Sequence, residues 1–180
     1  MKNILVITCF LFCFQPAQAL AETRLGLGAG WAFCDKTECN EERSGNDLSP
    51  DTVQWQLEQR LTRDLYIQAR AEMNWWMYGS YGLHLKYVFP SGYVQNQHTG
   101  FYLRGGIHRY DVDLEKFSFS WETREKEKYS GTSYSMGVGW QRYTESSWGL
   151  AGELFYTDLD RYQSYGATLT LSYRFGGSRF

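Results

Sequence analysis

The C-terminal stretch from Tyr165 to Phe175 alternates strictly between two kinds of residue. Tyrosine, alanine, leucine and phenylalanine take every second position, and glycine, threonine, serine and arginine take the positions between them. A period of two predicts a β-strand with one apolar and one polar face. Aromatic residues gather at one end of the apolar row and leucines fill its middle, which is typical of a strand that faces lipid. The apolar face of this strand is therefore expected to point out of the protein.

The same alternation recurs along the chain and predicts seven further strands. They cover approximately residues 23–33, 53–60, 65–75, 82–89, 101–108, 134–141 and 148–157. A short turn is expected at 77–80, and a long charged loop at 111–128 with room for strand extensions at its ends. An even number of antiparallel strands can close on itself and leave no open edge. The predicted fold class is thus all-β, an eight-stranded antiparallel up-and-down transmembrane β-barrel.

The composition favours a membrane barrel over two other classes. Tyr, Trp and Phe make up 18% of the 180 residues, yet no stretch reaches the roughly 20 consecutive apolar residues of a transmembrane helix. A soluble lipocalin-like barrel would place its apolar faces inside and its polar faces outside. The polar rows of this chain contain Gln, Arg, Glu, Gly and Ser but few lysines, unlike a solvated surface. We therefore expect the polar rows to line the interior.

The N-terminus predicts a cleaved signal peptide. Lys2 precedes an apolar stretch at residues 4–14, and small residues follow it. Cleavage after Ala19 or after Ala21 fits the pattern, and the second is preferred, which gives a signal peptide at 1–21 and a barrel domain at 22–180. The full chain has a net charge of −2, which offers no electrostatic case for nucleic acid binding.

Cys34 and Cys39 remain after the signal peptide is removed. Disulfides persist in exported proteins, so we expect these two residues to form a disulfide that closes a tight loop. A metal site is the weaker interpretation, because no second Cys or His pair accompanies them. No metal and no cofactor are expected.

Charged residues recur on the polar rows and are the candidate lumen residues. An eight-stranded barrel has an interior just wide enough for its own side chains, and buried charges must be paired. We therefore favour a plug of ion pairs over an ion or solute pathway. The expected lumen charge network consists of Glu58, Arg60, Arg70, Glu72, Lys86, Arg104, Glu153 and Arg174.

Several segments resemble one known family. They are Gly106-Ile-His-Arg-Tyr-Asp-Val-Asp113, Ser133-Tyr-Ser-Met-Gly-Val-Gly139, Gly152-Glu-Leu-Phe-Tyr-Thr-Asp158 and Leu171-Ser-Tyr-Arg-Phe175, and they resemble the OmpA-like small outer-membrane β-barrels. The resemblance implies a monomer in the Gram-negative outer membrane, in contact with its lipid and lipopolysaccharide. It also implies that Tyr173 and Phe175 form the signal for the barrel-assembly machinery. The chain departs from the family by continuing to Phe180, so either Phe175 or Phe180 can be the terminal aromatic.

Three histidines raise the alternative of an enzyme. Some eight-stranded outer-membrane barrels modify lipid A with a His–Ser–Glu arrangement, but no His-x-Ser pair occurs in a strand of this chain. His84 and His108 are expected to face the lumen, and His98 lies in a connection. We therefore expect no catalysis.

The connections after the first and fifth strands are rich in acids, with five from Asp35 to Asp47 and six from Asp111 to Glu127. Rigid scaffolds commonly carry function on such loops. We expect a scaffold for surface loops that serves envelope integrity, adhesion or surface interaction, with a host surface or a phage among its partners. A narrow porin and a lipid A-modifying enzyme are the alternatives.

Overall fold

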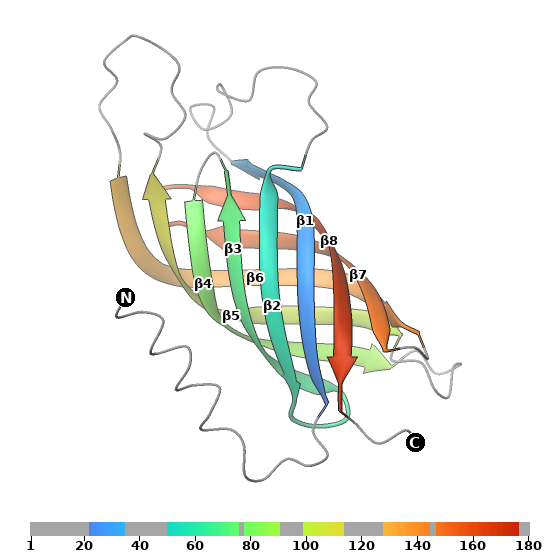
Figure 1. Ribbon diagram of the computed structural model, residues 1–180. Coiled ribbons are helices and arrows are strands. Elements are labelled where there is room, and N and C mark those ends of the chain that lie inside the picture. The colour runs from blue at the N-terminus through green and yellow to red at the C-terminus, as the bar shows by residue number, and fades with distance from the viewer. Residues whose placement is uncertain are drawn as a thin grey trace, which may run out of the picture.

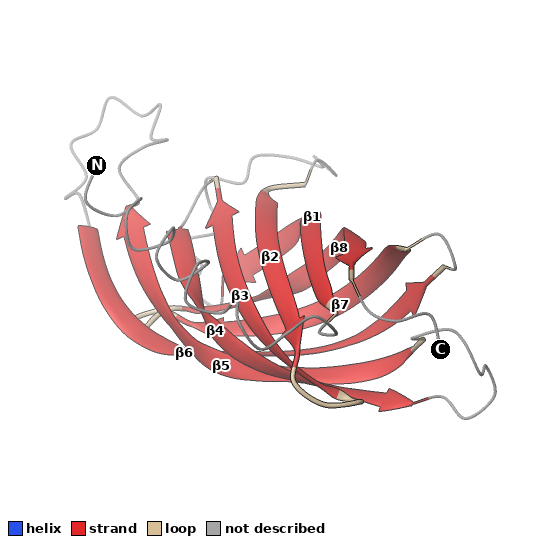
Figure 2. Ribbon diagram, turned by 60° about the horizontal axis from the view of Figure 1, so that its bottom comes forward, coloured by secondary structure: helices blue, strands red, loops and turns tan. Residues whose placement is uncertain are grey.

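A computed structural model describes residues 22–34, 50–75, 78–90, 99–113, 128–144 and 147–176. Its ordered elements are all strands, as Figure 2 shows. They are β1 (Thr23–Cys34), β2 (Thr52–Arg60), β3 (Leu65–Asn74), β4 (Tyr78–Pro90), β5 (Gly100–Asp113), β6 (Lys128–Tyr143), β7 (Trp148–Asp158) and β8 (Gln163–Phe175). The described part of the chain has no helix long and apolar enough to cross a membrane.

Each strand pairs antiparallel with the next, and β8 pairs with β1, so the sheet closes into a barrel. The start of β1 and the end of β8 therefore lie side by side (Figure 1), with Thr23 opposite Phe175. The predicted fold class, an eight-stranded antiparallel up-and-down β-barrel, is confirmed. Closure matters because it removes the open edge that a sheet would otherwise expose.

The apolar row of each strand points outward. At the β1–β8 seam, Leu27 and Leu171 are opposite each other and 55% and 53% exposed. One position away, Thr170 is 2% exposed, and Arg24 on the same inner face is completely buried. The prediction for the direction of the two faces is confirmed, and the lipocalin-like alternative, which needs buried leucines, is excluded.

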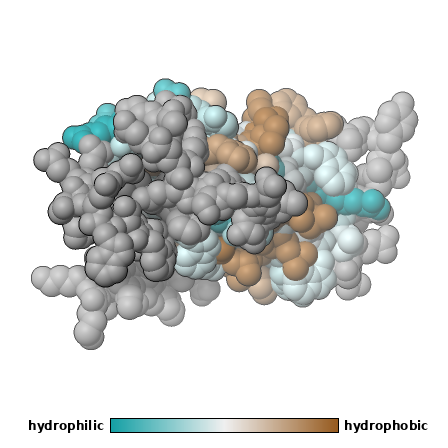
Figure 3. Space-filling model, turned by 90° about the horizontal axis from the view of Figure 1, so that it is seen from above, coloured by the Kyte–Doolittle hydropathy of each residue, from teal (hydrophilic) through white to brown (hydrophobic). Residues whose placement is uncertain are grey.

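Large apolar side chains cover the outside of the barrel. They come from seven of the eight strands and include Phe101, Ile107 and Leu154, each more than 60% exposed, whereas Ile67 and Met73 of β3 are half-buried. In Figure 3, hydrophobic residues gather on the outer surface beside hydrophilic ones. A soluble monomer rarely exposes an apolar patch larger than a few hundred Å², so this belt is suited to hydrocarbon rather than to water.

Inward glycines make room for large lumen side chains. A Cβ at Gly26 would lie 2.7 Å from Cγ of Gln56, and one at Gly139 would lie 2.5 Å from Cζ of Tyr102. Either contact would force the larger side chain to move. These glycines let long polar and aromatic residues lie across the neighbouring strand.

One predicted boundary is wrong. The turn expected at 77–80 is shorter, because Gly79 and Ser80 already belong to β4 and pair with Asp111 and Tyr110. The strand extension expected at the start of the 111–128 loop is confirmed, since β5 continues to Asp113. Glycine, serine and aspartate have low strand propensity, but cross-strand pairing in the β4–β5–β6 sheet overrides this local preference.

The connections alternate between the two ends of the barrel. Residues 35–51, 75–77, 114–127 and 159–162 join strands at one end, and residues 61–64, 91–99 and 144–147 join them at the other end, where β1 starts and β8 finishes. Short turns mark the periplasmic side of such barrels. We therefore expect the end with 61–64 and 144–147 to face the periplasm.

The orientation of β8 predicts the effect of a charge on its outer face. Leu169 lies midway between Tyr165 and Tyr173 on that face. Leu169→Arg is expected to lower the free energy of unfolding in lipid vesicles by about 2–4 kcal/mol, because the guanidinium would lie near the bilayer midplane. Phe175→Arg, at the end of the same row, is the matched control and should cost only about 0–1 kcal/mol. Equal costs at the two positions would contradict the assigned depth.

Candidate functional site in the barrel interior

Seven charged side chains on the inner faces of the strands, together with Glu22 just before β1, form two buried groups. The Arg24 group contains Glu22, Arg24, Glu58 and Lys86, and the Glu153 group contains Arg70, Glu72, Arg104 and Glu153. No side chain in either group is more than 5% exposed. Each group sets two cations against two carboxylates. Such a balance is what a water-poor interior demands, since an unpaired buried charge is very costly.

Arg24 is the centre of the first group. Its Nε lies 2.5 Å from a carboxylate oxygen of Glu22, and its Nη2 donates a hydrogen bond of 2.8 Å to the hydroxyl of Tyr66. The guanidinium also lies 4.3 Å from the ring centroid of Tyr66 and 4.0 Å from that of Tyr143. Aromatic faces attract a desolvated cation. Arg24 is therefore held by one carboxylate and two tyrosines.

Glu58 joins Lys86 to the first group. Nζ of Lys86 lies 2.7 Å from one oxygen of Glu58, and Nε2 of Gln68 donates to the same oxygen at 3.0 Å. The other oxygen of Glu58 is 3.6 Å from Nη1 of Arg24, too far for a good hydrogen bond. Lys86 also lies 4.2 Å from the ring centroid of Tyr102.

Glu153 is the centre of the second group. It accepts hydrogen bonds from Nη1 of Arg70 at 2.6 Å and from Nη2 of Arg104 at 2.9 Å. The hydroxyl of Tyr102 donates to its second oxygen at 3.0 Å. Because Lys86 lies over the ring of the same tyrosine, Tyr102 connects the two groups. One carboxylate thus pairs with two arginines that come from different strands.

Glu72 completes the second group. Nη2 of Arg70 donates to one of its oxygens at 2.8 Å, and the hydroxyl of Tyr78 donates to the other. Arg70 therefore bridges two carboxylates, Glu72 and Glu153. Its planar guanidinium, with several fixed donors, is suited to this bridging role.

A buried histidine–serine pair lies beside Arg104. Nε2 of His84 is 2.7 Å from Oγ of Ser135, and Nη1 of Arg104 donates to the same oxygen at 3.1 Å. A guanidinium can only donate, so Oγ of Ser135 accepts from Arg104, and the donor between Oγ and Nε2 of His84 depends on which ring nitrogen carries the proton. In the register, Gly106 of β5 lies between His84 of β4 and Ser135 of β6. A Cβ at Gly106 would lie 2.6 Å from Cδ2 of His84.

This pair does not form a complete catalytic triad. Nδ1 of His84 has no hydrogen-bond partner among the described residues, whereas a catalytic base is oriented by a third group. His84 and Ser135 are only 4% and 6% exposed. The pair is best explained as part of the packed interior.

Apolar side chains close the interior at the end of the long connections. Their cluster contains Ala32, Tyr78, Tyr110, Val112, Phe155, Leu159 and Tyr162. Leu159 and Tyr162 come from the β7–β8 connection, where the amide of Leu159 donates to the carbonyl of Tyr162. This connection therefore folds inward over the charged groups.

The structure places the predicted lumen residues as follows. Glu58, Arg70, Glu72, Lys86, Arg104 and Glu153 lie within the two groups. Arg60 lies at the rim, with 25% of its side chain exposed, and pairs with Glu22 at 3.5 Å. Arg174 is half-buried near the end of β8 and has no acidic partner among the described residues. The expected network is thus a compact set of six, with Arg60 and Arg174 at its edge.

Two other predicted features lie at or beyond the limits of the described residues. Cys39 falls outside them and the side chain of Cys34 is not described, so the disulfide stays a prediction. Tyr173 and Phe175 lie at the end of β8 with ring centroids 4.8 Å apart, while Phe180 falls outside the described residues. His98 also falls outside them.

Sequence reasoning missed several members of the site. Arg24 takes an inward position of the first strand but is absent from the expected charge network, and Glu22 precedes that strand by one residue. Tyr66 and Tyr102 also occupy inward positions of the alternation. The inward register was therefore a usable signal, but which inward residues meet across the lumen depends on the stagger of all eight strands. The described residues contain no group of three or more His, Cys, Asp or Glu that could hold a metal ion.

Comparison with known proteins identifies the kind of barrel. A family model described as "Outer membrane protein beta-barrel domain" matches residues 5–175. No curated protein matches the chain in sequence.

Solved structures share the fold at low sequence identity. The N-terminal β-barrel domain of OprF from Pseudomonas aeruginosa has a TM-score of 0.61 and 12% identity, over 86% of this chain and 97% of that chain. Ail, the attachment invasion locus protein of Yersinia pestis, has a TM-score of 0.54 and 15% identity, over 87% and 99%. A de novo designed transmembrane β-barrel has a TM-score of 0.50 and 9% identity, over 86% and 95%. Because a designed barrel shares this architecture, the fold does not specify a function.

The pairing of Glu153 predicts a large loss of stability when it is removed. Glu153→Ala leaves Arg104 without its carboxylate and Arg70 with only one, so the free energy of unfolding should fall by about 3–5 kcal/mol. Glu72→Ala is the matched control, because Arg70 keeps Glu153, and it should cost about 1–3 kcal/mol. Urea titration of protein folded in vesicles measures both values, and planar-bilayer recording measures conductance. A change in conductance with unchanged stability would contradict a structural plug.

The burial of Ser135 predicts that it does not react with a serine-directed probe. Folded protein in detergent is incubated with a fluorophosphonate, and labelling is read by peptide mass spectrometry. We expect no adduct at Ser135, because the hydroxyl is enclosed and His84 lacks an orienting acid. An adduct at Ser135 that disappears in His84→Ala would show an activated nucleophile and refute the packing interpretation.

Proposed function

Because the chain belongs to the outer membrane protein β-barrel domain family, and so to the bacterial outer membrane, we propose that it is a closed scaffold whose outer connections contact partners outside the cell. It performs no chemistry of its own in this proposal. Export by cleavage of residues 1–21 and insertion by the barrel-assembly machinery are parts of the same proposal.

The β5–β6 hairpin is the observation that carries this proposal. Its outward residues are apolar as far as Ile107 and Tyr134, a cross-strand pair. Beyond them the outward pairs become polar, first Arg109 with Thr132 and then Asp111 with Ser130. From residue 107 to the end of β5 the strand extends a further 20 Å or so, at about 3.3 Å per residue. The two strands of the hairpin thus continue past the apolar belt before they reach the segment 114–127 that joins them.

The inner side of the projecting hairpin stays packed. Tyr110 and Val112 are 3% and 2% exposed and belong to the apolar cluster that closes the interior. A rigid base lowers the conformational entropy that a loop loses when it binds. This arrangement supports a role in presenting residues 114–127 to a partner.

The interior supports a scaffold better than a pore. Its eight charges are arranged in two neutral groups, so a conducting path would require buried ion pairs to separate. Separating such pairs without replacement partners is costly. A narrow porin is therefore the less favoured alternative.

The partner is expected to be a host surface, a phage or lipopolysaccharide. Residues 114–127 carry mixed charge, which suits a polar partner. The name of the Yersinia pestis neighbour, attachment invasion locus protein, describes that protein, which shares only the fold with this chain. The proposal therefore rests on the hairpin.

Deletion of residues 117–126 tests this function. Heat-modifiable gel mobility should stay as in the wild type, because the deletion leaves β5 and β6 intact. Binding of the expressing bacteria to host cells, or adsorption of a phage that uses the protein, should fall to the level of a strain lacking the gene. Replacing the same ten residues by a Gly/Ser linker of equal length separates the role of the side chains from loop length. Full binding in both variants would refute the role of this loop.

A further inference from the structure

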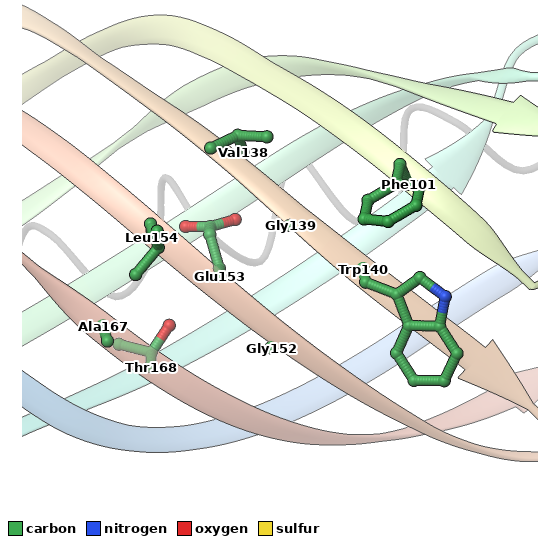
Figure 4. Close-up of a pocket in the computed structure, with 9 residues that line it drawn as sticks. All are labelled: Phe101, Val138, Gly139, Trp140, Gly152, Glu153, Leu154, Ala167 and Thr168. Atoms are coloured by element: carbon green, nitrogen blue, oxygen red, sulfur yellow. The ribbon is translucent and has the colours of Figure 1, made fainter.

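The outer surface of the barrel has a hollow over β5 to β8. It measures about 380 Å³, and its lining includes Phe101, Val138, Trp140, Gly152, Leu154 and Ala167 (Figure 4). In that view Trp140 and Phe101 lie at one end, Leu154 and Ala167 at the other, and Gly152 between them. The hollow is therefore an elongated apolar groove on the face that meets lipid.

Gly152 creates the groove. It takes an outward position on β7, between Leu150 and Leu154, and lies opposite Trp140 in the register. A Cβ at Gly152 would meet no heavy atom within 4 Å. The barrel itself does not require a glycine here, because a side chain would point into free space. The groove stays open because glycine has no side chain that would fill it.

The groove lies in the half of the barrel nearer the short turns. Trp140 is three residues before the end of β6 at Tyr143, and Gly152 is four residues after the start of β7 at Trp148. Trp148 packs edge-on against Tyr173 of β8, with ring centroids 5.0 Å apart. Aromatic residues of this kind mark the membrane–water boundary. With the short turns in the periplasm, the groove meets the periplasmic leaflet.

An exposed cation lies at the boundary end of the groove. Arg142 follows Trp140 by two residues, so it shares the outward face of β6, and it is exposed. No acidic residue pairs with it in the described part of the chain. A guanidinium at the depth of the headgroups can bind a phosphate through two parallel hydrogen bonds. Arg142 and the groove thus provide a phosphate-binding cation and, beside it, an apolar channel.

We propose that this surface binds one phospholipid of the periplasmic leaflet. The phosphate contacts the guanidinium of Arg142, the glycerol region lies against Trp140, and one acyl chain occupies the groove over Gly152. A second copy of the chain fits poorly, since nine residues line the groove and a stable protein interface uses about 20–30 residues on each side. The site is independent of the outer loops, so the proposed function and this inference can fail separately.

Native mass spectrometry of the intact protein tests the inference. The folded protein is released from nanodiscs of phosphatidylglycerol, and the number of lipids that it retains is counted. The wild type should retain one. Gly152→Leu fills the groove that holds the acyl chain, and Arg142→Gln removes the charged hydrogen bonds to the phosphate. Each variant should lower the fraction of protein that retains the lipid by about tenfold. Diacylglycerol of the same chain length, which lacks the phosphate, should not be retained.

Two variants on the same surface are matched controls. Gly105 is an outward, exposed glycine of β5 where a Cβ would also meet nothing within 4 Å, and it lies outside the groove. Arg109 is an exposed arginine toward the opposite end of the barrel. Gly105→Leu and Arg109→Gln should retain the lipid as the wild type does, and heat-modifiable mobility confirms that all four variants fold. The inference would be overturned if Gly152→Leu retained the lipid as the wild type does, or if the control variants lost the lipid to the same extent. It would also be overturned if the wild type formed a dimer that Gly152→Leu abolishes.

Discussion

Closure of the sheet between β1 and β8 is the constraint on which the rest of the structure depends. Hydrocarbon offers no partner for backbone N–H and C=O groups, so a sheet can cross a membrane only if it has no open edge. Twelve paired positions between Thr23 and Cys34 provide that closure. Once the barrel is closed, each strand has one face toward lipid and one toward the interior. Because side chains alternate between the two faces, the alternation in the sequence decides which residues face lipid and which face the interior.

The interior solves a different problem. An eight-stranded barrel leaves space for side chains but little for water, and this chain fills the space with eight charges. They are tolerated because each group is neutral and because tyrosines supply further donors and ring faces. Glu153, which holds Arg70 and Arg104 together, joins strands that are distant in sequence. The interior thus resembles a polar core that gives the scaffold stiffness.

That stiffness links the interior to the two outer surfaces. At the end of the long connections, β5 and β6 continue beyond the apolar belt, and their inner side stays packed as far as Val112. At the other end, the lipid-facing surface is uneven, with the groove at Gly152 beside Arg142. A barrel that is uniform in architecture therefore offers two surfaces of different chemistry, one facing the outside and one facing lipid.

The sequence alone determined the fold class, the eight strands and the direction of each face, because alternation is a local property that closure does not alter. It also identified six of the eight charged residues in the two lumen groups, since inward positions can be read from the period. Only the tertiary structure decided which charges meet, that Arg24 stacks between Tyr66 and Tyr143, that Ser135 reaches His84, and where β5 ends. Those contacts depend on the stagger and tilt of neighbouring strands. Residues that are far apart in the sequence determine this stagger and tilt together. The groove at Gly152 depends on the same stagger, because it exists only where a glycine of one strand lies beside large residues of the next.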